Sequence, residues 1–167
     1  MSASEIYSPK LFELPITPAD ASHRNEADLP WVEMGLDIKM KLLSANDKTG
    51  TWISLYQFPA GLVLPKHRHS GCVVAYTLQG KWCYLENDFV ATKGSMIQET
   101  ANSAHTLSVD ADNTEPTIVF FVVEGSLTHY DENGNVWGID DAQTMLQRYL
   151  ELSAAQDTPV KREQVAY

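Results

Sequence analysis

Hydrophobic and polar residues alternate in short segments through most of the chain, which is the pattern of half-buried β-strands. In TWISLYQF (51–58), Trp52 and Phe58 fall on one face and Ile53 and Leu55 on the other. Four further segments are short, rich in β-branched and aromatic residues, and bounded by Gly, Asn or Asp: 72–78, 81–86, 95–99 and 117–125. The last is apolar on both faces, which predicts a central strand covered on both sides.

One segment near the C-terminus follows the helical period instead. Within residues 140–155, Met145 and Tyr149 lie four positions apart on one predicted face. Asp140 or Asp141 can cap the first turn, because a side-chain oxygen at this position accepts a hydrogen bond from a free backbone N–H group. The sequence therefore predicts one late helix.

The order of these elements predicts an all-β fold, either an antiparallel barrel or a sandwich, that ends in a helix. DENGNV (131–136) contains an Asn-Gly pair and is predicted to be a turn between two strands. Residues 1–30 include four prolines and are interpreted as an N-terminal arm. We expect the barrel with its C-terminal helix at residues 31–155 and a C-terminal tail at 156–167.

Composition and charge narrow the classes of partner. The chain has 167 residues, 44% hydrophobic, and a formal net charge of −10. This charge argues against nucleic acid and against an anionic membrane surface, since both require a basic footprint. No apolar run is long enough for a transmembrane helix, and the N-terminus lacks the pattern of a signal peptide. We expect no membrane partner and a cytoplasmic location.

The two cysteines cannot form a disulfide scaffold. Cys72 and Cys83 flank the predicted turn at Gly80 and could face each other across a hairpin. Reduced thiols are the interpretation that fits a cytoplasmic protein.

Two histidines one residue apart are the first candidates for chemistry. Side chains at i and i+2 of a strand point to the same face, so His67 and His69 would project together. Such a pair occurs on many surfaces and becomes informative only through its surroundings. Gly61 precedes the pair and Gly80 follows it, and a second glycine-led segment, GSMIQETANSAHT, delivers His105.

This arrangement resembles the first motif of the cupin superfamily: Gly, five residues, His-x-His, three or four residues, Glu, six residues, Gly. The match runs through Gly61, His67, His69 and Gly80, with Val73 at the position of the usual metal-binding glutamate. Valine cannot bind a metal, so this departure affects the ligand set directly.

The second cupin motif is Gly, five residues, Pro-x-Gly, two residues, His. Gly94 and His105 match it, whereas Thr100 replaces the proline and Asn102 the glycine. These two departures concern only the geometry of the turn, since Asn accepts a positive φ more readily than most residues.

Cupins with three histidines and no carboxylate in the first motif include two groups of nonhaem iron enzymes, acetylacetone dioxygenase and 2,4'-dihydroxyacetophenone dioxygenase. The chain is more similar to the second, in segments such as LPKHRHSGCV, AHTL and FFVVEGSLTHYDENGNVWGIDD, and the resemblance covers about residues 30–150. It implies a single cupin jelly-roll barrel, with His67, His69 and His105 as metal ligands.

Glu99 stands six residues before His105, at the end of a predicted strand. It could be an exposed carboxylate in a surface salt bridge. The resemblance instead implies a glutamate beside the metal, either as a direct ligand or as a base that accepts a proton from the substrate. We assign Glu99 to proton handling rather than to direct ligation. Alternation would place Val73, Ala75, Ile97 and Leu107 on the substrate pocket wall.

Other residues rank lower as functional candidates. His129, beside the predicted turn at 131–136, and His23, in the arm, are expected to be surface residues. Four aromatic residues are expected to pack in the core or the sheet rather than bind substrate, although one of them could line the mouth of the pocket: Trp52, Trp82, Tyr84 and Phe121.

Three neutral imidazoles suit iron, zinc, copper or nickel. The resemblance favours Fe(II) and implies an enzyme that uses O2 to cleave a carbon–carbon bond of a small aromatic α-hydroxyketone or β-diketone. Two alternatives stay open: a non-catalytic metal-binding sensor, such as the zinc-holding domain of some anti-sigma factors, and an isomerase or decarboxylase on the same barrel. We also expect a homodimer, because the arm needs a surface to pack on and a partner would cover the barrel edge.

Overall fold

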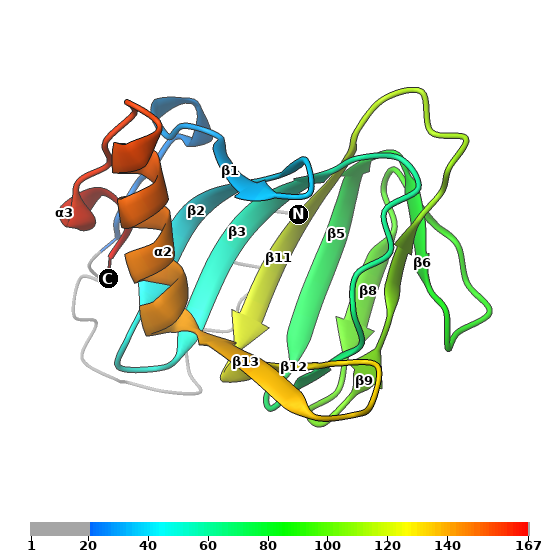
Figure 1. The fold of residues 1–167 in the computed structure, drawn as a ribbon. Coiled ribbons are helices and arrows are strands. Elements are labelled where there is room, and N and C mark those ends of the chain that lie inside the picture. The colour runs from blue at the N-terminus through cyan, green and yellow to red at the C-terminus, as the bar shows by residue number, and fades with distance from the viewer. Residues whose placement is uncertain (1–20, 167) are drawn as a thin grey trace, which may run out of the picture.

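The computed structural model describes residues 21–166, whose strands form three antiparallel sheets (Figure 1). The largest sheet has the order β1 (Val32–Gly35), β2 (Ile38–Asn46), β3 (Thr51–Phe58), β11 (Thr117–Glu124), β5 (Val73–Gln79) and β8 (Met96–Glu99). The second has the order β13 (Val136–Asp141), β12 (Ser126–Tyr130), β4 (His67–His69) and β9 (Ala104–His105). The third consists of β10 (Leu107–Val109), β6 (Lys81–Tyr84) and β7 (Ala91–Thr92).

One hydrophobic core joins the large sheet to the third sheet and to the helical segments, which confirms the predicted all-β barrel. Trp82 of β6, Leu107 of β10 and Phe121 of β11 belong to the same buried cluster. In Figure 1 the large sheet curves around the interior, while β12 and β13 cross one open end.

The large sheet follows the alternation read from the sequence. β3 covers the predicted segment 51–58, and β11 lies between β3 and β5, as expected of a central strand. Along β11, Val119 and Phe121 are buried, whereas Ile118 and Phe120 on the other face are only half-buried. Within one chain, the outer face of this strand is therefore only partly covered, in contrast to the predicted full cover of both faces.

The predicted helix is α2 (Ala142–Ala155), and Asp141 caps it. The Asp141 carboxylate accepts a hydrogen bond from the backbone N–H of Thr144, and the Thr144 hydroxyl accepts one from the backbone N–H of Asp141. Met145 and Tyr149 are buried, and α2 packs on β2 and β1 at one side of the barrel (Figure 1).

The segments before and after the barrel pack against each other. Residues 1–20 of the expected arm lie outside the described residues; the rest of it contains a 3-10 turn, η1 (Glu26–Asp28). Arg24 donates hydrogen bonds to the carbonyl groups of Gln164 and Ala166. The segment expected to be a tail holds a short helix, α3 (Arg162–Val165), that lies beside β2.

Among the residues with a positive φ, Gly80 and Asn102 lie at motif positions identified in the sequence. Gly80, between β5 and β6, has φ 82°, and an added Cβ would lie 2.2 Å from the Thr117 hydroxyl oxygen. Asn102 has φ 67°. The expectation that asparagine could replace the motif glycine at this turn is confirmed, because its backbone takes the left-handed conformation.

Both cysteines are free, in agreement with the expected reduced thiols. Cys72 precedes β5 and Cys83 lies in β6, and these strands belong to different sheets. Among residues 21–166, no helix is long and apolar enough to cross a membrane.

Candidate metal centre

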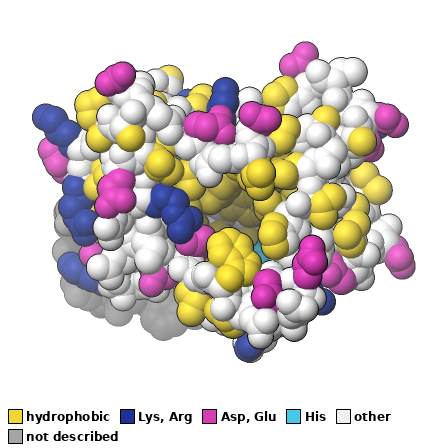
Figure 2. Space-filling view, in the orientation of Figure 1, with side chains coloured by type: hydrophobic (Ala, Val, Ile, Leu, Met, Phe, Trp, Pro, Cys, Tyr) yellow, Lys and Arg dark blue, Asp and Glu magenta, His cyan; other side chains and the backbone are white. Residues whose placement is uncertain are grey.

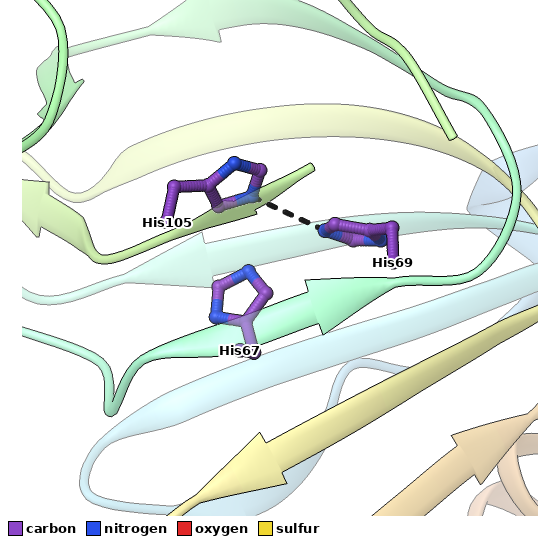
Figure 3. Close-up of side chains that lie close together, drawn as sticks. All are labelled: His67, His69 and His105. Carbon is purple, nitrogen blue, oxygen red and sulfur yellow. Dashed lines mark hydrogen bonds between the residues drawn. The ribbon is translucent and has the colours of Figure 1, made fainter. Parts of the chain in front are cut away.

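Strand register brings the three predicted histidines together. His67 and His69 stand at the two ends of the three-residue strand β4, with the exposed Arg68 between them. β4 pairs with β9, where His105 lies directly opposite His67. All three histidines are buried, and their rings point toward one another in Figure 3.

The ring nitrogens are close enough to share one ion. One nitrogen from each histidine lies within 4.8 Å of the other two. Nε2 of His69 is 3.2 Å from Nε2 of His105. Nδ1 of His67 lies 3.1 Å from the Pro65 carbonyl oxygen and donates to it, which leaves Nε2 as the atom available to an ion.

Burial keeps these imidazoles in the form that binds metals. Together with the neighbouring histidines, it lowers the pKa of His69 to about 3 and that of His105 to about 4. Burial also lowers the pKa of His67. Neutral imidazole is the ligand form of histidine. A buried set of three such nitrogens therefore suits a divalent transition metal.

Glu99 completes the group from the large sheet. At the end of β8 it is 6% exposed, which rules out the surface salt bridge considered from the sequence. Its Oε2 lies 3.2 Å from Nε2 of His69 and 3.3 Å from Nε2 of His105. Oε1 accepts a hydrogen bond of 2.5 Å from the Tyr84 hydroxyl. Burial raises the pKa of Glu99 to about 7, against the opposing effect of this hydrogen bond.

A buried carboxylate oxygen beside the histidines fits the donor set of a cation. Within residues 21–166, Oε2 of Glu99 has no hydrogen-bond partner. Atoms about 2.1 Å from one ion lie roughly 3 Å apart, which is close to the spacing of Oε2 and the two Nε2 atoms. This spacing is compatible with Glu99 as a ligand or as a close neighbour of the ligands.

Tyr84 holds this group in place from the third sheet. Its ring stacks on His105, with centroids 3.6 Å apart and an angle of 14° between the planes, while its hydroxyl bonds Glu99. Tyr84 was expected mainly to pack in the core. It also contacts both the imidazole and the carboxylate of the candidate site.

A cavity of about 560 Å³ opens onto the histidines. His67 and His69 form part of its lining, whereas His105 and Glu99 do not. Its walls are largely apolar and include Trp52, Phe58, Leu64, Leu107, Phe121 and Val123. Figure 2 shows the hollow, with hydrophobic side chains gathered around it.

Of the four residues expected on the substrate pocket wall, one lines the cavity and three do not. Leu107 lines the cavity, whereas Val73, Ala75 and Ile97 are not among its lining residues. Val73 and Ala75 are buried and Ile97 is half-buried.

Side chains of β6 explain the difference. Trp82 donates a hydrogen bond to Thr77 of β5, and Tyr84 donates one to Glu99 of β8. These two aromatic residues therefore cover the inner face of β5 and β8, and the cavity lies against β3 and β11 instead. Three of the four aromatic residues expected mainly in the core line it, whereas the sequence allowed for one: Trp52, Tyr84 and Phe121.

His129 is not the surface residue that the sequence suggested. β12 pairs with β4 so that His129 lies directly opposite His67, and their ring centroids are 6.3 Å apart. His129 lines the cavity together with Asp140 and Arg148. A pairing between segments about 60 residues apart leaves no signal in local periodicity, so only the strand register could have revealed it.

The antiparallel barrel and its inward-facing histidines define a cupin. The family model of the ChrR cupin-like domain matches residues 20–132, and the chain belongs to that family. No curated protein matches the chain.

Solved structures agree with this assignment. An RmlC-like cupin protein from Ralstonia eutropha JMP134 is 32% identical, with 86% of this chain and 94% of that chain covered and a TM-score of 0.77. An acetylacetone dioxygenase from Acinetobacter johnsonii is 17% identical over 84% of this chain and 97% of its own, with a TM-score of 0.68.

The complex of SigE with the anti-sigma ChrR from Rhodobacter sphaeroides also matches, at 19% identity and a TM-score of 0.50. The match covers 60% of this chain and 52% of that chain. At such identities the last two structures support the fold alone.

Proposed function

We propose that this protein is an Fe(II)-dependent dioxygenase that uses O2 to cleave a carbon–carbon bond of a small aromatic α-hydroxyketone or β-diketone. The observation that carries the proposal is the position of His67 and His69 on the wall of an apolar cavity of about 560 Å³. A structural metal site is closed by its own ligands, whereas a catalytic one keeps a side open. This candidate site has room for a ligand the size of a substituted benzene.

The donor set fits the ion. His67, His69 and His105 would hold it, and three neutral ligands leave its full positive charge to attract an anionic, oxygen-bearing substrate. When bound, Fe(II) supplies Lewis acidity toward the substrate oxygens and redox chemistry toward O2. Zinc, nickel or copper could occupy the same nitrogens in a purified sample.

The protein's own residues would bind the ring, exclude water and handle a proton. Apolar walls that include Trp52, Phe121 and Val123 surround the space beside the histidines and favour an aromatic group over water. Glu99 would take up the proton that the substrate loses at its enol or hydroxyl oxygen. Tyr84 keeps Glu99 oriented through its hydrogen bond to Oε1.

For an α-hydroxyketone, the proposed reaction consumes one O2 and no external reductant. The bond between the carbonyl carbon and the hydroxymethyl carbon breaks, and the two carbons leave as a carboxylic acid and formic acid. Each product gains one oxygen atom from O2, and the substrate supplies the electrons.

The test is a reaction of the Fe(II)-loaded protein under labelled O2 with a panel of aromatic α-hydroxyketones and β-diketones. From an α-hydroxyketone we expect one labelled oxygen in each of two acid products, and from a β-diketone one in a carboxylic acid and one in an α-ketoaldehyde. In both cases O2 uptake should equal substrate loss. Label in only one product would contradict the proposal. Equal turnover without O2 would favour an isomerase or decarboxylase.

A second candidate function is a non-catalytic metal-binding sensor, favoured by the match to the ChrR cupin-like domain. The same experiment separates the two, because a sensor would retain its metal without consuming O2. The cavity beside the histidines favours the enzyme, since a sensor that binds only an ion needs no space of this size.

A further inference from the structure

A row of three histidines crosses three neighbouring strands, and only two of them belong to the candidate metal site. His105 of β9 lies opposite His67 of β4, and His67 lies opposite His129 of β12. Directly opposed residues of an antiparallel pair project to the same face. His129 is thus placed on the cavity wall beside the candidate metal ligands, with its own set of contacts.

Those contacts hold the His129 ring in one orientation. Its Nε2 lies 2.9 Å from Oδ2 of Asp140, a carboxylate that is 8% exposed. The other carboxylate oxygen, Oδ1, accepts a hydrogen bond of 2.6 Å from Arg148 of α2. Trp137 packs against the imidazole, with ring centroids 4.9 Å apart.

The charges of this cluster determine what His129 can offer to a ligand. Arg148 compensates the charge of Asp140 through its contact with Oδ1. In neutral His129, the hydrogen on Nε2 is donated to Asp140, and Nδ1 keeps a free lone pair. Nδ1 has no hydrogen-bond partner among residues 21–166.

We propose that Nδ1 of His129 accepts a hydrogen bond from a hydroxyl group of the ligand in the cavity, and that Asp140 is a positioning residue that fixes the imidazole for this role. The ligand is then an aromatic ketone with a hydroxyl donor in addition to any oxygens that reach the ion. This inference rests on the proposed function only for the choice of an aromatic ketone as ligand.

If His129 served only a structural ion-pair network, it would need only a hydrogen-bond donor at Nε2. Such a network ties β12, β13 and α2 together through Asp140, and any ring that donates from Nε2 would satisfy it. It gives no reason for selectivity between ligands that differ in one hydroxyl group. Selectivity is therefore the measurement that separates the two roles.

The experiment uses the full chain loaded with zinc at pH 8, where an ordinary imidazole is neutral and no turnover occurs. Binding of 4-hydroxyacetophenone and of 4-methoxyacetophenone is measured by titration calorimetry. We expect the parent protein to prefer the hydroxyl probe by roughly three- to tenfold, the usual worth of one hydrogen bond. His129→Phe keeps a ring but removes the acceptor, and should bind both probes equally.

Three further variants complete the test. His129→Asn restores an acceptor near the position of Nδ1 and should recover part of the preference for the hydroxyl probe. Asp140→Asn should reduce the preference seen in the parent protein. His23→Phe makes the same change at an exposed site and should leave the parent's preference unchanged.

Failure to bind either probe, equal binding by the parent protein, or an unchanged preference in His129→Phe overturns the proposal. A preserved preference without O2 uptake in the iron-loaded protein would instead refute the dioxygenase function and leave this inference standing.

Discussion

Glu99 lies directly opposite Val73 across the pair of strands β5 and β8, and both side chains are buried. Val73 occupies the position at which the cupin motif usually carries a metal-binding glutamate. In this protein the carboxylate is placed on the neighbouring strand, where its Oε2 faces His69 and His105. The site therefore contains one carboxylate, as in the usual motif, but on β8 instead of β5.

Restoring the usual glutamate should be costly without metal. Val73→Glu would bury a second carboxylate opposite Glu99, and two such charges cannot both ionise at low cost. We expect the metal-stripped variant to lose about 3 kcal/mol or more of unfolding free energy at pH 8, measured by denaturant titration. Val73→Gln, of similar size and uncharged, is the matched control and should lose less. Equal stability of Val73→Glu and the parent would contradict the expectation.

Glu99 itself should make the metal-stripped protein sensitive to pH. Its pKa is raised from 4.5 to about 7, so the folded state binds the proton more tightly than the unfolded state does. The contribution of protonated Glu99 to the unfolding free energy is fully present below about pH 4.5 and is lost as the pH rises through 7. The unfolding free energy of Glu99→Gln minus that of the parent should therefore rise by up to about 3 kcal/mol between pH 4.5 and 8. Both free energies are measured from denaturation curves at matched pH. A difference that stays constant with pH would contradict this cause.

In the iron-loaded protein, the same substitution should keep the metal and slow turnover. Glutamine preserves the shape of Glu99 but cannot take up a proton, and positioned acid–base groups contribute roughly 100- to 10,000-fold. Metal content and O2 uptake are measured on the same preparation. Loss of the metal would show instead that Glu99 is a direct ligand.

The three histidines should be required for metal and not for the fold. Changing His67, His69 or His105 to alanine is expected to remove most of the bound metal, measured by elemental analysis against about one ion per parent chain. Barrel packing should persist, because the core lies mainly in the large and third sheets. His23→Ala is the control. Full metal content in the triple variant would refute the ligand assignment.

Local patterns predicted much of the fold because they act over a few residues. Alternation located β3, and a capping carboxylate at Asp140 or Asp141 located the start of α2. Histidines at cupin spacing predicted a site that the structure brings together. The roles of His129 and Tyr84 depend on which distant strands become neighbours, and that information is spread over the whole chain.

A homodimer is also expected, through the outer face of the large sheet. Phe120, Tyr76 and Met96 lie side by side across β11, β5 and β8 on this face, and Tyr76 and Met96 are 42% and 63% exposed. A second copy of the chain would remove this apolar row from water.

Light scattering at micromolar concentration should therefore give a dimer mass for the parent protein. Tyr76→Asp should shift the mass toward the monomer, whereas Thr114→Asp, in an exposed loop, should not. A monomer mass for the parent would refute the dimer, and an unchanged dimer in Tyr76→Asp would place the interface elsewhere.

The pair formed by Arg148 and Asp140 joins the C-terminal helix to a wall of the cavity. Helix ends and edge strands usually open in local fluctuations that cost less than global unfolding. Here an opening of α2 would also release Asp140 and, through it, His129. Slow motions of the helix and of the cavity wall should therefore occur as one event, and a ligand that reduces one should slow amide hydrogen exchange in both.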